Sequence, residues 1–301
     1  MFTGRTLPMK DISGQFGLTV KRSCEFSYVG KLPTRLALRV VPCTRQQHIE
    51  QALTANGVAG IITFKELASH VPETFGLAYS ENPLGSAMAL QSYIAGIDNF
   101  QWESFESRIH PTAVIHQGAS VAPRDVVIGA GTIIYPNAVI LPRSIIGKNC
   151  SIGPGTVVST EAFEVDVSRD PHVVCRQSGG VRIADNVDVQ ANCTLVRSTF
   201  GGFTELGEGT KLDCQVHFAH DCRTGCNVRI AACAEISGRV EIGDRAFIGP
   251  NVSISNGITI QADAKVSIGA VVTRDVSIGE TVTGNFAVAH RKWISFMRTL
   301  K

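Results

Sequence analysis

The residues best suited to chemistry cluster in the segment GTKLDCQVHFAHDCRTGC, residues 209–226. Two histidines, two aspartates and several cysteines in such a segment could bind a metal ion. They could also supply a general base with an acidic partner, because an imidazole accepts protons near neutral pH. A third possibility is that they are ordinary turns of a repetitive wall. The choice depends on how the surrounding chain positions these side chains.

A six-residue repeat surrounds the segment. From Ile109 onward, aliphatic residues return at every sixth position, which fits neither a helix at 3.6 residues per turn nor an alternating strand. Glycine, asparagine and aspartate follow many of these positions and suit tight corners. The pattern predicts a hexapeptide parallel β-helix in which three hexads form one triangular coil. The expected inward residues include Ile128, Ile152, Val189, Leu212, Phe218, Ile236, Ile254, Val272 and Ile278.

This register separates the two histidines. Phe218 takes an inward position, His217 precedes it, and His220 follows two places later towards an outward-facing corner. Eighteen residues beyond His220, which is one coil along, comes Gly238, whose backbone N–H could approach a developing oxyanion. The same register scatters the nearby cysteines over different faces of the coil, so we predict no metal site. A histidine stacked on a glycine favours acyl transfer.

Composition narrows the possible partners. The chain has 301 residues, a formal net charge of +2, 44% hydrophobic and 18% charged residues. It contains neither a dense Lys/Arg run for nucleic acid nor the ~20 consecutive apolar residues of a transmembrane helix. Its start lacks the pattern of a signal peptide, so we expect a cytoplasmic location. Nine scattered cysteines then favour free thiols over disulfides.

The chain divides into three parts. Residues 1–105 alternate extended and helical segments, which predicts a small α/β domain that is a candidate for sugar-nucleotide recognition. Residues 106–283 form the β-helix, and residues 284–301 form an extension with helical spacing through Trp293, Phe296 and Leu300. The repeat breaks at 159–180 and 197–205. Such excursions are either solvated decoration or walls of a binding site, and we expect both to project beside the coils as walls of a binding site.

The chain resembles the UDP-3-O-acylglucosamine N-acyltransferases of lipid A synthesis, within the hexapeptide acyltransferase superfamily. The resemblance rests on QVHFAHD at 215–221, IHPTAVI at 109–115, GTVVSTEAF at 155–163 and the Asn82-Pro83 pair. It covers nearly the whole chain and implies a left-handed β-helix between an N-terminal α/β domain and a C-terminal helix. It also implies a homotrimer.

The resemblance implies an activity and roles for individual residues. An acyl group would pass from acyl carrier protein or CoA to the amine of a nucleotide-linked amino sugar, with no permanently bound cofactor. His220 would be the general base, Asp213 its orienting partner and Gly238 the oxyanion donor, although Asp213 could equally be an ordinary corner aspartate. The implied substrate contacts are Asn82, Phe163, Arg197, Gln215 and His217. A structural role for His217, or a solvated Arg197, is nearly as plausible.

Three departures from the family leave the substrates open. The family stacks uracil on aromatic residues near the segment RVVPCTRQQHI, residues 39–49, yet no Phe, Tyr or Trp lies between Tyr28 and Phe64. Residues 256–258 read NGI where the family has N-G-H. Residues 267–287 look like the end of acetyl-CoA-dependent acetyltransferases. An acetyl-CoA-dependent O- or N-acetyltransferase and a non-catalytic scaffold therefore remain alternatives.

Overall fold

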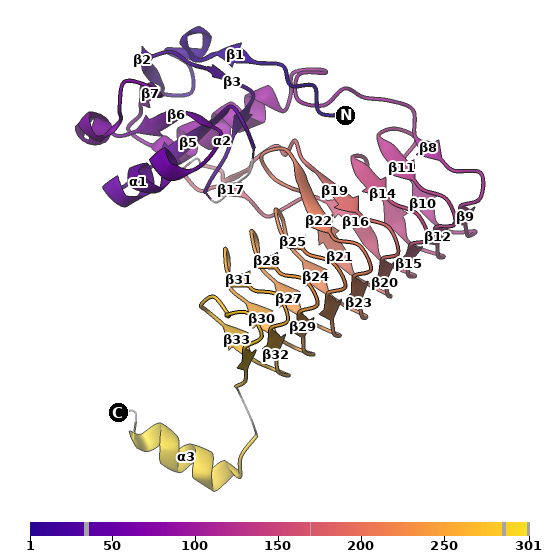
Figure 1. Cartoon of the computed structure of the whole chain (residues 1–301). Coiled ribbons are helices and arrows are strands. Elements are labelled where there is room, and N and C mark those ends of the chain that lie inside the picture. The colour runs from indigo at the N-terminus through magenta and orange to yellow at the C-terminus, as the bar shows by residue number, and fades with distance from the viewer. Residues whose placement is uncertain (33–35, 169, 285–286, 300–301) are drawn as a thin grey trace.

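The computed structural model describes residues 1–301 except 33–35, 169, 285–286 and 300–301. An α/β domain lies beside the early and middle coils of a long β-helix, and a separate helix ends the chain (Figure 1). Parallel strands dominate the described residues, so the predicted left-handed parallel β-helix with a short C-terminal helix is confirmed.

The N-terminal domain is built on a five-stranded sheet. Its strand order is β2-β7-β6-β5-β4, with β2 antiparallel to β7 and the other pairs parallel. The sheet strands are β2 (Thr19–Arg22), β4 (Tyr28–Val29), β5 (Arg39–Cys43), β6 (Val58–Thr63) and β7 (Gly76–Tyr79). A small sheet pairs β1 (Leu7–Pro8) with β3 (Glu25–Phe26). The helices are η1 (Met9–Ile12), α1 (Gln46–Thr54), η2 (Lys65–His70) and α2 (Pro83–Ile94).

Three parallel sheets form the walls of the β-helix. The first contains β10 (Ser120–Val121), β13 (Val139–Ile140), β16 (Val157–Thr160), β21 (Thr194–Val196), β24 (His217–Phe218), β27 (Glu235–Ile236), β30 (Ser253–Ile254) and β33 (Val271–Val272). The second contains β8 (Arg108–Ile109), β11 (Val126–Ile128), β14 (Ser144–Ile146), β19 (Gly180–Ile183), β22 (Phe203–Leu206), β25 (Arg223–Thr224), β28 (Glu241–Ile242) and β31 (Thr259–Ile260). The third contains β9 (Val114–Ile115), β12 (Ile133–Ile134), β15 (Ser151–Ile152), β20 (Asp188–Val189), β23 (Lys211–Leu212), β26 (Arg229–Ile230), β29 (Phe247–Ile248), β32 (Lys265–Val266) and β34 (Thr281–Val282).

The predicted hexad residues fill the interior from Ile128 to Val272, where they form one continuous buried cluster. The expectation was wrong at the last turn, because the Ile278 side chain is 68% exposed. The final coil is two residues shorter than the repeat, so Val276 takes the inward place and pairs with Ile260 of the coil below. One further strand, β34, still stacks on β32. The β-helix of this chain thus ends with a last coil that is shorter than the others.

The two excursions differ in how they leave the coils. The first carries the antiparallel hairpin of β17 (Val165–Asp166) and β18 (Val173–Val174). The second is buried rather than projecting into solvent: Ser198, Thr199 and Phe200 are each at most 5% exposed, and Phe200 belongs to the core of the N-terminal domain. The second excursion therefore joins the β-helix to that domain.

The C-terminal helix α3 (His290–Thr299) packs on nothing within the described chain, where none of its residues is buried. Trp293 and Phe296 are about half exposed. Leu300, which the sequence placed on the same helix face, lies outside the described residues. Within the part of the chain that the structure describes, no helix has both the length and the apolar character needed to span a bilayer.

Candidate active site

His220 and Asp221 form a hydrogen-bonded pair at the corner between β24 and β25. The distance from His220 Nδ1 to Asp221 Oδ2 is 2.8 Å. Asp221 has φ of 61°, a left-handed conformation that aspartate tolerates better than most residues. The corner thereby turns the aspartate of the HFAHDC segment back onto the histidine before it. An imidazole whose Nδ1 is held by a carboxylate has its orientation fixed and its Nε2 left for chemistry.

Gly238 lies directly against the ring of His220, as the repeat predicted. A Cβ atom at position 238 would come within 2.5 Å of both Cε1 and Nε2, so only glycine fits there. Gly238 itself is buried. Its backbone N–H donates no hydrogen bond to any group in the part of the chain that the structure describes. A free amide beside a histidine Nε2 is an arrangement that can stabilise an oxyanion.

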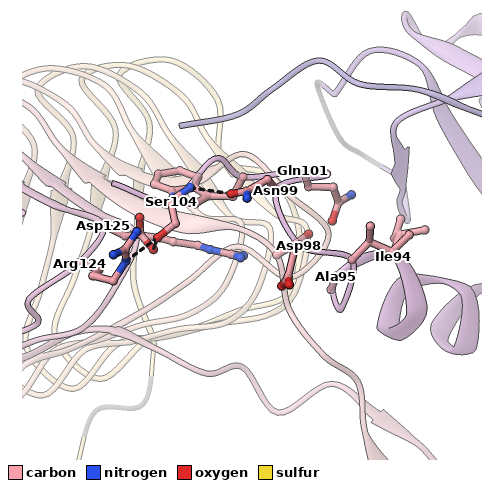
Figure 2. Close-up of a pocket in the computed structure, with 12 residues that line it drawn as sticks. Ile94, Ala95, Asp98, Asn99, Gln101, Ser104, Arg124 and Asp125 are labelled. Atoms are coloured by element: carbon pink, nitrogen blue, oxygen red, sulfur yellow. Dashed lines mark hydrogen bonds between the residues drawn. The ribbon is translucent and has the colours of Figure 1, made fainter. Parts of the chain in front are cut away.

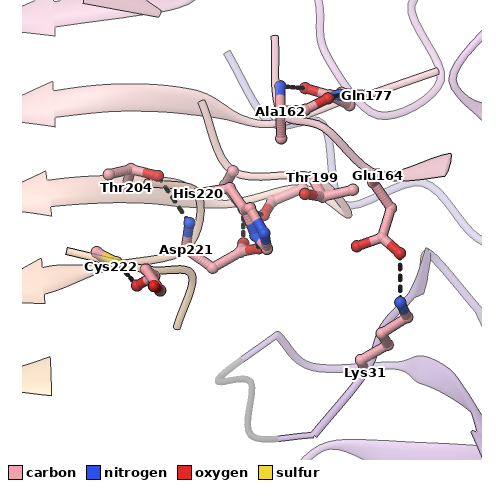
Figure 3. Close-up of polar contacts among 12 residues, drawn as sticks. Lys31, Ala162, Glu164, Gln177, Thr199, Thr204, His220, Asp221 and Cys222 are labelled. Atoms are coloured by element: carbon pink, nitrogen blue, oxygen red, sulfur yellow. Dashed lines mark hydrogen bonds and ion pairs between the residues drawn. The ribbon is translucent and has the colours of Figure 1, made fainter. Parts of the chain in front are cut away.

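The second excursion holds the Asp221 carboxylate. Ser198 donates a hydrogen bond to Asp221 Oδ1, and the Asp221 N–H donates to Thr204 Oγ1 at 2.8 Å. Figure 3 shows His220 and Asp221 turned towards each other next to Thr199. Burial raises the pKa of Asp221, but the hydrogen bonds from His220 and Ser198 and the charge of Arg239 outweigh it and hold the pKa below its ordinary value. The carboxylate is therefore ionised at neutral pH.

Asp213 does not contact His220. It lies at a different corner, between β23 and β24, where its Oδ1 accepts a hydrogen bond of 2.7 Å from the Cys214 N–H. The aspartate that lies against His220 is thus Asp221, whereas the orienting role expected of Asp213 stays a prediction without a contact to His220 among the described residues. The sequence contained the signal, since Asp221 follows His220 directly. Neighbouring residues point apart on a strand, and only the left-handed corner brings these two together.

The other predicted site residues are spread over the molecule. His217 lies on the outer face of β24, and its Nε2 is 3.7 Å from Glu235 Oε1 of the next coil. Gln215 Oε1 accepts a hydrogen bond from the Cys233 thiol. Phe163 is 91% exposed on the first excursion. Asn82 caps α2, with its Oδ1 accepting from the Gly85 N–H at 3.0 Å.

Arg197 ties the two excursions together. Its Nε and Nη2 donate to the Ser159 carbonyl oxygen at 2.9 and 2.7 Å. Burial lowers the pKa of the guanidinium, while the nearby charge of Glu161 opposes the shift. These bonds give Arg197 a structural role close to the site, because the next residue along the chain, Ser198, holds Asp221. Contact with a substrate phosphate remains a prediction.

A small groove opens on the N-terminal domain near the first excursion. Its volume is about 210 Å³, and its lining includes Lys31, Val41, Pro42, Thr44 and His48. Lys31 also forms an ion pair with Glu164 of the first excursion (Figure 3). Part of the groove is therefore lined by the segment 39–49, which contains no Phe, Tyr or Trp. The imidazole of His48 is the aromatic ring among its lining residues.

The described residues contain no group of three or more His, Cys, Asp or Glu side chains that could hold a metal ion. Cys222 illustrates the reason. Its side chain faces the interior of the coil, where burial raises the pKa of the thiol well above its ordinary value, whereas Cys226 is exposed.

Two family models match the coils of this chain. The model described as "Bacterial transferase hexapeptide (six repeats)" matches residues 125–160 and 221–256, and that described as "Hexapeptide repeat of succinyl-transferase" matches 239–274. Hexapeptide repeats of these descriptions therefore match parts of the β-helix. The second match of the six-repeat model begins at Asp221, directly after His220, and includes Gly238.

Curated relatives bear the same name as the family that the sequence resembles. The UDP-3-O-acylglucosamine N-acyltransferase of Janthinobacterium sp. (strain Marseille) is 30% identical over 166 residues, which cover 55% of this chain and 47% of that protein. The enzyme of the same name from Caulobacter sp. (strain K31) is 35% identical over 158 residues, covering 52% and 46%. The chain therefore spans about half the length of the curated relatives it matches.

Solved structures include similar chains. The UDP-N-acetylglucosamine acyltransferase from Campylobacter jejuni is 25% identical, with a TM-score of 0.48 over 59% of this chain and 72% of that one.

Proposed function

We propose that this chain is an acyltransferase that moves an acyl group from a thioester to the amine of a nucleotide-linked amino sugar. The observation that carries the proposal is the His220 ring, which Asp221 holds at Nδ1 and which lies against Gly238, a residue whose N–H donates to no group in the described chain. The names of the curated relatives support the same reaction. The product would enter lipid A or another surface polysaccharide.

The reaction follows from this geometry. His220 Nε2 takes a proton from the amine as its nitrogen attacks the thioester carbonyl carbon, so that a C–N bond forms. The carbonyl oxygen becomes an oxyanion, which the Gly238 N–H stabilises. The intermediate then collapses, the C–S bond breaks, and the departing thiolate recovers the proton from the imidazolium. Asp221 stabilises that imidazolium while it exists.

The proposal extends to the donor and the assembly. The donor is acyl carrier protein or CoA, whose phosphopantetheine arm lies along the β-helix between subunits of a homotrimer in the cytoplasm. No bound cofactor takes part, because the proton transfer and the oxyanion are both assigned to side-chain and backbone groups. Light scattering on the purified chain tests the assembly, with a mass of three chains expected.

The groove of the N-terminal domain favours a second candidate. Its lining contains no Phe, Tyr or Trp face on which uracil could stack, and its aromatic side chain is the imidazole of His48. An acetyl-CoA-dependent acetyltransferase acting on another sugar or small acceptor would not need such a face. The two candidates share the reaction at His220 and differ in donor and acceptor.

One assay separates these candidates. The release of free thiol is measured from an acyl carrier protein loaded with a long chain and from acetyl-CoA, each with UDP-, dTDP- and GDP-linked amino sugars. Turnover of the loaded carrier protein supports the proposal, and turnover of acetyl-CoA alone supports the second candidate. If no thioester is consumed with any of these acceptors, the proposal is wrong, and that result is the one a non-catalytic scaffold predicts.

A further inference from the structure

A separate polar cavity lies between the end of α2 and the early coils of the β-helix. Its volume is about 310 Å³, at the lower end of the range for small-molecule sites. Its lining comes from the segment 94–104 and from Arg124, Asp125 and Arg143 at the coil corners. Figure 2 shows Arg124 and Asp125 next to Ser104. Nothing in the reaction at His220 uses these residues.

Two buried polar atoms in the cavity wall lack hydrogen-bond partners within the described chain. They are Gln101 Oε1 and Trp102 Nε1, in side chains that are each only 4% exposed. The Gln101 amide is fixed, because its Nε2 donates to the Ser27 carbonyl oxygen at 2.9 Å. Buried polar groups without partners are rare because they are costly, and those in a cavity wall indicate a ligand. One is an acceptor and the other a donor.

Arg143 adds a cation with unused donors. Among the described residues its guanidinium makes one long hydrogen bond, from Nη1 to the Gln177 carbonyl oxygen at 3.5 Å, and it lies 5.6 Å from the centre of the Trp102 ring. Burial and the neighbouring Arg197 lower the pKa of Arg143 to about 10, with Asp125 opposing, so the group is charged at neutral pH. Such a guanidinium suits a carboxylate or a phosphate.

Two of the other charged groups of the wall, Arg124 and Asp125, are already engaged. Arg124 donates to Glu106 Oε1 at 2.7 Å and to Ser104 Oγ at 3.0 Å. Asp125 accepts from Ser104 Oγ at 3.1 Å and from the Phe105 N–H at 2.9 Å. Figure 2 shows the bonds that Ser104 makes with Arg124 and Asp125. Arg143 is therefore the cation that a ligand would meet, and the exposed Asp98 carboxylate is the anion of the wall for which the described residues offer no hydrogen-bond partner.

We infer that this cavity binds the oxyanion group of a compact metabolite, a carboxylate or a phosphate. Arg143 pairs with the oxyanion, Trp102 Nε1 donates to one of its oxygens, and Gln101 Oε1 accepts from a hydroxyl or amine of the same ligand. The cavity lies on the same corner edge as the candidate active site, three coils from Asp221. At ~4.8 Å per coil the separation is about 15 Å, so the two sites are distinct.

Calorimetry on the full chain tests this inference with two probes, inorganic phosphate and malonate, at constant ionic strength. At least one is expected to bind saturably at one site per chain. Arg143→Gln removes a charge-assisted pair and should weaken that binding at least ~10-fold. Arg274→Gln removes the same charge from an exposed residue and should leave affinity unchanged. The probe that binds more tightly identifies the oxyanion.

A second variant guards against misfolding of Arg143→Gln. Trp102→Phe keeps an aromatic ring under the guanidinium but loses the donor, so binding should weaken ~5-fold. His220→Ala should bind the probes as the wild type does, whatever its activity. The inference is overturned if neither probe saturates the wild type, if Trp102→Phe binds normally, or if His220→Ala abolishes binding.

Discussion

At the scale of single residues, the site depends on how Asp221 is held. Its Oδ2 meets His220 Nδ1, and its Oδ1 accepts from Ser198, which is 1% exposed. With both oxygens engaged, the carboxylate cannot rotate away from the imidazole. Its pKa lies below the ordinary value despite the opposing effect of burial. Asp221 therefore stays ionised and can stabilise the imidazolium that forms during proton transfer.

Replacing Asp221 by asparagine tests this pairing. Asp221→Asn keeps the shape but removes the charge and can hold the wrong tautomer of His220, so kcat should fall about 10²- to 10⁴-fold. Asp213→Asn is the matched control, because Asp213 bonds only its neighbouring backbone there, and should cost less than about 3-fold. Steady-state kinetics on both variants decide. A larger loss in Asp213→Asn would assign the orienting role to Asp213.

The lowered pKa of Asp221 also predicts a pH dependence of stability. A carboxyl whose folded pKa lies below its unfolded value of about 3.9 stabilises the fold above that pH. The contribution disappears as pH falls through the folded pKa. The free energy of unfolding should thus drop more steeply below about pH 4 in the wild type than in Asp221→Asn. Denaturant titrations between pH 7 and pH 3 measure both curves, and parallel curves would contradict the assignment.

At the scale of structural elements, the second excursion connects the site to the N-terminal domain. Ser198 bonds Asp221, while two residues later Phe200 packs in the core of that domain. Gln91 of α2 adds a bond of 3.0 Å to Ser178 Oγ of the first excursion. Both departures from the hexad repeat therefore serve to attach the domain beside His220.

Ser198→Ala removes the contact between this excursion and the carboxylate. A hydrogen bond to a charged group contributes about 1.5–3 kcal/mol, part of which positions Asp221. We expect kcat to fall roughly 3- to 30-fold with KM unchanged, since the acceptor does not touch Ser198 in this account. Ser253→Ala, on the exposed face of β30, is the control and should change neither constant. A rise in KM alone would instead make Ser198 a substrate contact.

The shortened last coil makes a prediction about stability. Ile236 is fully buried, so Ile236→Ala should destabilise the fold by about 2–5 kcal/mol. Ile278, which the unbroken repeat would place inside, is 68% exposed, and Ile278→Ala should cost less than about 0.5 kcal/mol. Chemical denaturation of the two variants compares them. Equal losses in the free energy of unfolding would indicate that the Ile278 side chain is buried.

At the scale of the whole molecule, the repeat made much of the structure predictable. One inward residue per six sets the register of every coil, so the burial of Phe218 and the stacking of Gly238 on His220 both follow from counting. The helices and parallel strands of the N-terminal domain also follow from local patterns. The excursions were located as interruptions of the repeat, because a solenoid has few other ways to accommodate inserted residues.

What the repeat could not show depends on departures from it. The pairing of His220 with Asp221 needs a left-handed corner, which the hexad pattern allows but does not specify. The burial of Phe200 in another domain is a long-range contact that leaves no periodic signal. At the last coil, Val276 rather than Ile278 takes the inward place because the coil is locally shorter. The residue types do not reveal this, since both are aliphatic. In each case the outcome depended on a local backbone departure or on a long-range contact that the six-residue period does not encode.

The central claim is that His220 is the general base of an acyl transfer. The most direct test compares the wild type with His220→Ala and His116→Ala, measuring transfer of the acyl group with the donor and acceptor that support turnover. His116 stacks on Tyr135 in the early coils and controls for loss of an imidazole. The account predicts that His220→Ala remains folded and loses at least ~10³-fold in kcat, while His116→Ala keeps normal activity. A near-normal rate in folded His220→Ala would contradict it.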